Sequence, residues 1–510
     1  MYIWKSFILP VVGVLLFASC KKHSEQDRDT VTVGLSSGPS TLDPRFATDA
    51  AGMRIDNLIF SSFVRIGQDL TVVADAAESW TYKDLTYIFV LRPDIAFAHG
   101  RLVEPEDILF SFQQYMSPNS PYNTSLQPIS EVTATTVEGE GKKRIHVKLK
   151  LKSFAAPLLT DLTTIKILPR EIVQSTGQDF GSNLTGSGSF KFISQNANEI
   201  VLEAVQNHAW AAPKIKKVIF KIIHDDNTLY LNTLKGNIDL SQAEIAMNKV
   251  ASLEKHQDFT VHKYPGLSMS YLVFNLRDPD LKNLDVRKVF ALGVDRQEII
   301  DFKLDRLATP ATSLLSPVNP FHFKDLKPIS TNKSLAKELV KKLGLQNKTF
   351  TIKSSNNPEV LEIGKVFANQ LTEVGLNIKT QSFEWGTFYQ DVKSGNFQVA
   401  SMRWVGLIDP DIYRDAFHSG QFPPGKNRGY YQNPALDKLL DEGAKIEDMG
   451  KRIAHYKQIQ EKIMNDMPIL PLWYRTQVSV VHKRIKNYQP TMNGDFFPLV
   501  TLSKEVSNNE

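Results

Sequence analysis

Cysteine is almost absent from this sequence of 510 residues, in which Cys20 is the only one. A disulfide within the chain is therefore impossible, and a zinc site built from several cysteines is excluded as well. Histidine is sparse too, with 11 residues. They include no HxxxH or HExxH pair that would bring two ligands to one metal ion. The sequence predicts no metal site and no cofactor.

An excess of charge of one sign is also missing. The chain has 60 Lys and Arg against 55 Asp and Glu, a net charge of +5, and its basic runs, such as Lys341-Lys342, are short. A nucleic-acid-binding protein usually carries a basic stripe, so we expect no nucleic-acid partner. The hydrophobic share of 42% is that of an ordinary soluble protein, and the length corresponds to about three domains.

A long apolar run is missing even at the N-terminus, where residues 1–20 read MYIWKSFILPVVGVLLFASC. Lys5 precedes about a dozen apolar residues, fewer than the roughly 20 that a membrane span needs. The pattern predicts a cleaved signal peptide over residues 1–19. Ala18-Ser19-Cys20 also resembles a bacterial lipobox, so we expect Cys20 to be lipidated and residues 20–30 to form a tether. An unlipidated signal peptide and a single membrane anchor remain the alternatives.

Strand and helix patterns alternate along the rest of the chain, which indicates an α/β fold. The clearest predicted strands are 30–35, 143–151, 376–383, 397–404 and 476–481, and the clearest predicted helices are 104–116, 285–302, 335–343, 359–374 and a pair within 434–466. The strand–helix–strand unit at 376–404 is expected to form a right-handed crossover.

Catalytic motifs are weak. Ser330 and Lys333 form an SxxK pattern, and Ser355-Asn356-Asn357 and Lys393-Ser394-Gly395 loosely complete the set found in penicillin-interacting enzymes. However, the set is compressed into one short region, and Ser330 lies in a loop before the helix that it should begin. We therefore expect no enzyme and keep a penicillin-interacting enzyme as the alternative.

Aromatic residues gather where a ligand site is expected. Trp385 and Trp404 fall at ends of the crossover unit, where ligand crevices of α/β sheets form. Arg403 and Asp409 are close to Trp404 in the sequence, and Tyr430 lies near the end of the loop segment QFPPGKNRGYY. This clustering favours a binding site, although packing in the core is the alternative for each aromatic residue.

Six motifs in order resemble those of one protein family. They are GPSTLDP at 38–44, the block from Glu78-Ser79-Trp80 to Glu106-Asp107, TGSGSFKF at 185–192, GNID at 236–239, DVRK at 285–288 and VDR at 294–296. The sequence is similar in these places to the family 5 extracellular solute-binding proteins, the peptide-, dipeptide- and nickel-binding components of bacterial ABC importers.

The resemblance implies a two-lobed clamp of three domains that closes over its ligand. Domain I would be discontinuous, with parts at 31–60, 184–270 and 477–510. Domain II would cover 61–183 and domain III 271–476, with two strands crossing between domains I and III.

The resemblance also implies a function. The chain would be a monomeric, lipid-anchored protein of the cell envelope that captures peptides and delivers them to an ABC permease in the inner membrane. The alternatives are a non-peptide solute such as a metal chelate, haem or a sugar, and a role as a ligand sensor.

Site residues follow from the resemblance in the same way. The two tryptophans match those that line side-chain pockets in peptide binders, and the strand ending at Asn275 would bond the ligand backbone. The expected ligand-binding residues are Ser40, Tyr271, Asn275, Trp385, Arg403, Trp404, Asp409 and Tyr430.

One position departs from the family. Peptide binders carry an aspartate three residues after the second tryptophan, where it neutralises the ammonium group of the ligand, and this chain has Leu407 there. A buried ammonium without a counter-charge is costly. Either Asp409 takes over this role, or the ligand has no free amino terminus at that place.

Overall fold

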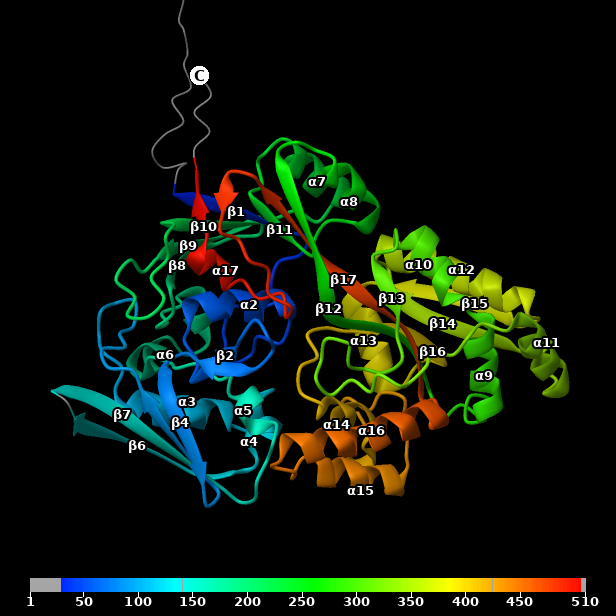
Figure 1. Cartoon of the computed structure of the whole chain (residues 1–510), viewed down its shortest axis with the longest axis horizontal. Coiled ribbons are helices and arrows are strands. Elements are labelled where there is room, and N and C mark those ends of the chain that lie inside the picture. The colour runs from blue at the N-terminus through cyan, green and yellow to red at the C-terminus, as the bar shows by residue number, and fades with distance from the viewer. Residues whose placement is uncertain (1–28, 140, 424, 506–510) are drawn as a thin grey trace, which may run out of the picture.

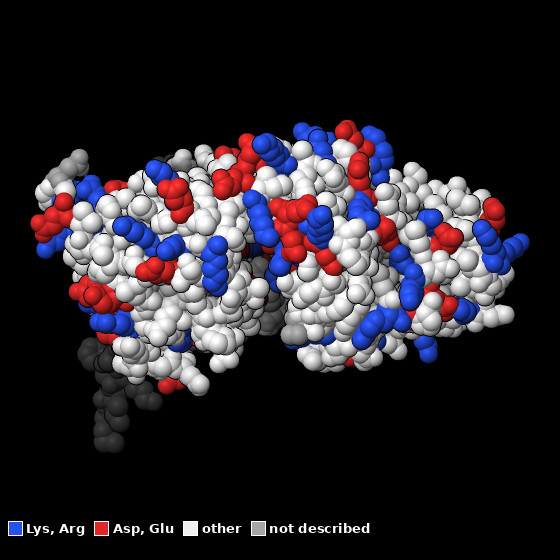
Figure 2. Space-filling view, turned by 90° about the horizontal axis from the view of Figure 1, so that it is seen from below, with Lys and Arg blue, Asp and Glu red and all other residues white. Residues whose placement is uncertain are grey.

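The computed structural model describes residues 29–139, 141–423 and 425–505, so the expected signal peptide and Cys20 lie outside the described residues. Two bodies joined by a pair of long strands make up the described chain (Figure 1). None of the helices in the described ranges has the length and apolar character needed to cross a membrane. On the face seen in Figure 2, acidic and basic side chains are interspersed over the described surface.

The first lobe contains a mainly extended core with a small antiparallel domain below it. Its upper sheet has the order β11 (Leu240–Gln242), β1 (Thr30–Leu35), β10 (Lys217–Ile222), β9 (Glu199–Ala204) and β8 (Phe190–Gln195). The strand predicted at 30–35 is confirmed, and the fully buried Val31 and Val33 show why its sequence alternates. Helices α7 (Asp226–Leu234) and α8 (Met247–Glu254) follow β10 and β11.

The lower part of this lobe is a four-stranded antiparallel sheet with helices beside it. The strand order is β4 (Ala77–Lys83), β5 (Thr86–Leu91), β7 (Lys142–Leu151) and β6 (Ile129–Gly139). Helix α3 (Pro105–Tyr115) begins with a capping box made by Glu104 and Asp107, which stabilises its first turn. The other elements are α2 (Ala50–Ile59), β2 (Val64–Ile66), β3 (Val72–Ala74), α4 (Asn123–Leu126), α5 (Leu158–Asp161), α6 (Arg170–Thr176), the 3₁₀ helix Gly177–Ser182, β18 (Ile485–Lys486), α17 (Pro498–Thr501) and β19 (Ser503–Lys504).

The second lobe is a sheet covered by helices on both faces. Its strands are β15 (Asn377–Phe383), β14 (Thr349–Ser355), β16 (Val399–Trp404) and β13 (Ala308–Pro310), together with the ends of the two long strands. Its helices are α9 (Leu284–Gly293), α10 (Arg296–Lys303), α11 (Lys333–Lys342), α12 (Pro358–Glu373), α13 (Trp385–Ser394), α14 (Ile412–Phe417), the 3₁₀ helix Ser419–Gln421, α15 (Pro434–Gly443) and α16 (Met449–Asp466).

The long strands β12 (Phe259–Phe274) and β17 (Ile469–His482) join the lobes. They pair with each other in antiparallel register, with an irregularity between Pro265 and Met269. Along the second-lobe part of β12, Leu272 and Phe274 enter the core under α9–α12, whereas Tyr271 and Val273 enter the core under α14–α16. The domain limits expected after residues 270 and 476 fall inside these two strands.

Two expected elements differ from the structure. The helix expected at 285–302 is two helices, because the chain leaves the helical conformation at Val294 and the Asp295 side chain caps α10 by accepting from the Glu298 amide. The strand expected at 476–481 begins earlier in the structure, because Ile469–Trp473 also belongs to β17. Pro471 pairs with Tyr271 where β12 and β17 shift register between Ser270 and Tyr271, and such irregularities are places where a sheet tolerates proline.

Candidate functional site

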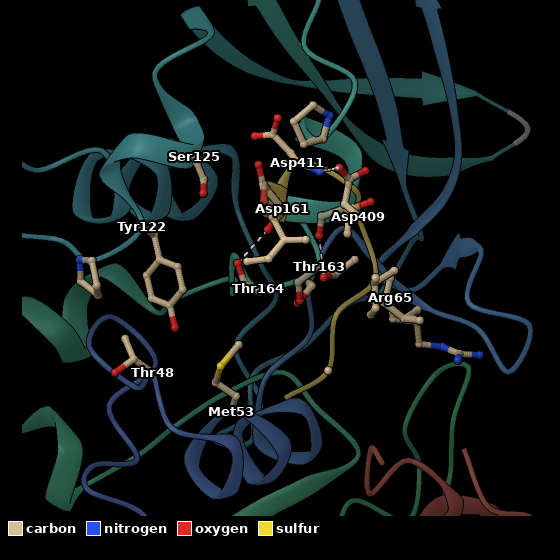
Figure 3. A pocket seen from close by; sticks show the side chains of 18 of the residues that line it. Thr48, Met53, Arg65, Tyr122, Ser125, Asp161, Thr163, Thr164, Asp409 and Asp411 are labelled. Carbon is tan, nitrogen blue, oxygen red and sulfur yellow. Dashed lines mark hydrogen bonds between the residues drawn. The ribbon is translucent and has the colours of Figure 1, made fainter. Parts of the chain in front are cut away.

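A cavity of about 1170 Å³ lies between the two lobes. Helix α2 and the segments 121–128 and 152–166 supply its walls from the first lobe, and the segment 405–415 supplies the facing wall from the second. Figure 3 shows side chains from these segments pointing toward a common space. Both lobes therefore contribute walls to the same space.

Asp409 lies in this cavity but already has a counter-charge. Its Oδ1 accepts from Arg452 Nη2 at 2.7 Å and its Oδ2 accepts from Arg452 Nη1 at 3.0 Å. The amide of Asp411 also donates to Oδ1, at 2.8 Å. A two-point pair of this kind neutralises the carboxylate and fixes its orientation. Asp409 therefore holds the 405–411 loop onto α16, and its carboxylate is fully engaged.

Two other aspartates face the same part of the cavity without such partners. Asp161 comes from the end of α5 in the first lobe and Asp411 from the start of α14 in the second, and Figure 3 shows them close together. Oδ1 of Asp411 is buried and has no hydrogen-bond partner among the described residues. Neither carboxylate forms an ion pair with a described residue.

The surroundings of these two carboxyl groups disfavour their charged forms. Burial, and then the neighbouring Asp409 and Asp415, raise the pKa of Asp411 to about 7. Burial, and then Asp409 and Asp411, raise the pKa of Asp161 well above its usual range. Like charges brought together out of water behave in this way, and a cation placed between them reverses the effect.

The opposite wall of the cavity, near α2, has its own buried charges. Lys166 donates from Nζ to Ser62 Oγ at 2.7 Å and to the carbonyl of Thr163 at 3.1 Å. Asp56 is 2% exposed, its Oδ1 has no partner among the described residues, and burial raises its pKa well above the ordinary value. Buried charged and polar groups therefore line this wall of the cavity.

Beside the cavity is a second feature, a stack of four aromatic rings and one arginine that we call the aromatic stack. Trp385 stacks on Tyr389 with 5.4 Å between ring centroids, and Tyr271 stacks on Trp404 at 6.3 Å. Arg428 lies between the two pairs, with Cζ 4.8 Å from the Trp404 ring and 5.1 Å from the Tyr389 ring. A small hollow of about 20 Å³ borders Tyr271, Trp404 and Arg428.

The expected site residues thus fall into separate groups. Asp409 lines the large cavity, Tyr271 and Trp404 line the small hollow, and Trp385, which is 54% exposed, lies at the outer end of the aromatic stack. The resemblance placed all of these residues in one site, and the structure divides them between two spaces.

The other expected residues line neither space. The Asn275 side chain donates to the carbonyls of Gly395 at 3.0 Å and Phe397 at 2.8 Å. Tyr430 lies under the Arg277 guanidinium, with Cζ 3.6 Å from the ring centroid.

Arg403 and Ser40 are likewise engaged elsewhere. Arg403 points to the other face of the sheet, 3.6 Å from Glu359. Ser40 is exposed and bonds to Asp49, the residue that caps α2.

Sequence reasoning missed the residues that matter most to the geometry. Asp411 lies in the acidic run IDPDIYRD, where the expected ligand-binding residue was its neighbour Asp409. Asp161 belongs to a four-residue helix with no motif. Arg428 belongs to the segment QFPPGKNRGYY, two residues before Tyr430, and no feature of the sequence predicted that it is buried.

Chemistry other than binding finds no support in the described residues. Ser330 is exposed in the segment before α11, and Lys333 Nζ bonds Glu373 at 2.7 Å, so the two do not form a nucleophile and base. Within the described ranges, no three His, Cys, Asp or Glu side chains are grouped to hold a metal ion.

Comparison with known proteins agrees with this picture. The model of the bacterial extracellular solute-binding proteins, family 5, matches residues 71–423. The chain is 26% identical to the oligopeptide-binding protein AppA of Bacillus subtilis over 502 residues, which cover 92% of this chain and 91% of that protein.

Solved structures show the same fold. AppA of B. subtilis in complex with a nonapeptide matches with a TM-score of 0.83 at 24% identity, covering 94% of this chain and 99% of that one. NikZ of Campylobacter jejuni in complex with Ni(L-His) matches with a TM-score of 0.82 at 22% identity, covering 94% and 100%. The expected two-lobed α/β clamp is therefore confirmed.

The family match also bears on the enzymatic alternative. Members of the matched family are substrate-binding transport proteins and not enzymes, which confirms the expectation of a non-catalytic chain. With a family model covering more than half of its length and a relative aligned almost end to end, this chain belongs to the bacterial extracellular solute-binding proteins, family 5.

Proposed function

We propose that this chain captures peptides in the cell envelope and delivers them to an ABC permease. The observation that carries the proposal is the cavity of about 1170 Å³ with walls from both lobes. Small-molecule sites commonly enclose roughly 300–1,000 Å³, so this one suits a solute larger than a single amino acid. The relative whose name specifies oligopeptides supports the same solute class. In this proposal Cys20 carries the lipid anchor and the chain acts as a monomer.

The ammonium group of such a peptide would meet Asp161 and Asp411. Asp409 is bound on both oxygens by Arg452, and Leu407 is apolar and buried, so neither supplies a free negative charge. The two unpaired carboxylates come from opposite lobes, so a cation between them would hold the lobes together. This arrangement takes the place of the aspartate that the resemblance led us to expect at position 407.

We expect Trp404→Ala to weaken peptide binding by more than about 1 kcal/mol, because the change removes an aromatic surface that borders the small hollow beside the cavity. Isothermal titration would measure the loss. Trp80→Ala is the matched control, since Trp80 stacks on Phe89 in the lower sheet of the first lobe and should leave affinity unchanged. Equal affinities for the wild type and Trp404→Ala would remove Trp404 from the site.

Native mass spectrometry of the full-length protein purified from cells tests the solute class directly. We expect bound masses that form a series differing by amino-acid residues, because closure of two lobes over a solute slows its release. A single bound mass that fits no peptide, or an empty protein that ignores added peptides, would contradict the proposal. That result would favour a solute of the kind held by the nickel–histidine relative.

A further inference from the structure

Arg428 is a buried cation without an acidic partner. The residue is 9% exposed, and no described Asp or Glu lies within ion-pair distance of its guanidinium. Lys426, two residues before it, does have such a partner, because its Nζ lies 2.5 Å from Asp415 Oδ2. A buried charge is costly unless it is paired, so the missing partner of Arg428 requires an explanation.

The surroundings of Arg428 fix the guanidinium but do not neutralise it. Nη2 donates to Tyr389 Oη at 3.0 Å and Nη1 to Tyr271 Oη at 3.4 Å. The rings of Trp404 and Tyr389 stabilise the cation from its sides. A guanidinium has five N–H donors, and the described residues provide no further acceptors for its side chain. Three donors therefore remain for another molecule.

The small hollow is the space beside these donors. It borders Arg428, Tyr271 and Trp404, and it is next to the large cavity, because Lys426 lines both spaces. Trp404 borders the hollow and Val405, the next residue, borders the cavity, so the two spaces are neighbours along the chain as well.

The size of the hollow restricts the group that enters. Its volume is about 20 Å³, whereas one water molecule needs roughly 10–15 Å³ by the same measure. A planar group of two small oxygens fits such a space, and a tetrahedral phosphate or sulfate is larger. Arginine binds carboxylates through two parallel hydrogen bonds, which matches the donors that remain free.

We propose that Arg428 binds a carboxylate of the solute, with Tyr271, Tyr389 and Trp404 positioning the guanidinium. The inference rests on the proposed function, since it concerns the solute of the same cavity, and it assigns Arg428 as the residue that selects solutes with a free carboxylate. For a peptide, the group is the terminal carboxylate or an acidic side chain.

Two matched peptide mixtures test this assignment. We would offer the ligand-free full-length protein dipeptides to pentapeptides of alanine and leucine, once as free acids and once as C-terminal amides, and follow binding by native mass spectrometry and titration. The wild type should bind the acids at least about tenfold more tightly than the amides, as expected for a charged hydrogen-bonded pair. Arg428→Met should bind acids and amides with similar affinities, and Arg428→Lys should retain part of the preference for acids.

Arg277→Met is the control, because Arg277 also stacks on a tyrosine but lines neither space. It should keep the full preference for free acids. The proposal is overturned if the wild type binds acids and amides equally, or if Arg428→Met keeps the preference. Thermal melting of each variant would show that the fold is retained.

A titration with acetate tests the carboxylate site independently of the proposed peptide-binding function. If no peptide of either form binds, the peptide proposal fails, and the melting temperature in increasing acetate at constant ionic strength then decides the role of Arg428. Stabilisation of the wild type that is absent from Arg428→Met supports a carboxylate site, and the same response in both proteins rejects it.

Discussion

Gly186→Ala is expected to lower the free energy of unfolding by about 3 kcal/mol, because the turn that contains Gly186 has no room for a side chain. A Cβ atom at this position would lie 2.1 Å from the Ile59 carbonyl oxygen and 2.7 Å from the Phe60 ring. The turn cannot move away easily, since the amide of Gly188 donates to the same Ile59 carbonyl at 2.8 Å and Ala98 bonds the Gly186 carbonyl. Denaturant unfolding followed by circular dichroism would measure the change.

The control for this prediction is Gly364→Ala. Gly364 lies within α12, and a Cβ there would meet nothing within 4 Å. Alanine is the better helix former by about 1 kcal/mol, so this variant should be as stable as the wild type or more stable. Similar losses for both variants would mean that close packing against Ile59 is not what requires glycine at position 186.

Asp411→Asn is expected to have opposite effects on stability and on binding. In the folded protein the pKa of Asp411 is about 7, whereas its ordinary value is 3.8. The folded state therefore binds a proton more readily, and the stability of the ligand-free protein falls as pH rises from about 4 to 7. The asparagine variant lacks this loss, which is on the order of 4 kcal/mol, so it should melt at a higher temperature than the wild type at pH 8.

Binding should show the complementary pH dependence. A peptide with a free ammonium group needs the ionised carboxylate, so its affinity for the wild type should fall about 100-fold between pH 8 and pH 5, two units below the pKa. N-acetylated peptides should show little of this change. The charged and titratable groups that face Asp411 from the surrounding elements are Asp161, Asp409, Asp415, Arg414, Arg452 and Tyr456.

Asp415→Asn provides the matched control, because Asp415 is on the same segment but is paired with Lys426. It should keep most of the pH dependence, whereas Asp411→Asn and Asp161→Asn should reduce it. If N-acetylated and free peptides bind alike at every pH, these aspartates do not hold the ammonium group.

Local signals in the sequence were enough to predict most helices and strands. The helix expected at 359–374 is α12 within one residue at each end, because Asn357 caps it and its apolar residues recur with helical spacing. The break between α9 and α10 had a signal too, since Asp295 is a good cap, but the apolar pattern continued across it. Because the helical spacing of apolar residues continued across the break, the prediction merged α9 and α10 into one helix.

The proposed ligand site was harder to predict from the sequence than the helices and strands, for a physical reason. Asp161 and Asp411 are 250 positions apart and meet only because two lobes face each other. No spacing or periodicity encodes such a meeting. The sequence does not predict that Arg428 lacks an acidic partner either, because this depends on how far the fold places the acidic residues from its guanidinium.

The two strands that join the lobes also constrain the order in which the chain can fold. Strand β11, which completes the parallel part of the first-lobe sheet beside β1, has β17 as its other neighbour. The residues of β17 that pair there are Ser479, Val480 and Val481, which follow the whole second lobe in the sequence. The first-lobe sheet therefore stays open along this edge until the second lobe and β17 have been made. A chain that ends within the second lobe would expose the unpaired edge of β11. Because exposed strand edges pair with other chains, we expect a chaperone to protect this edge at that stage.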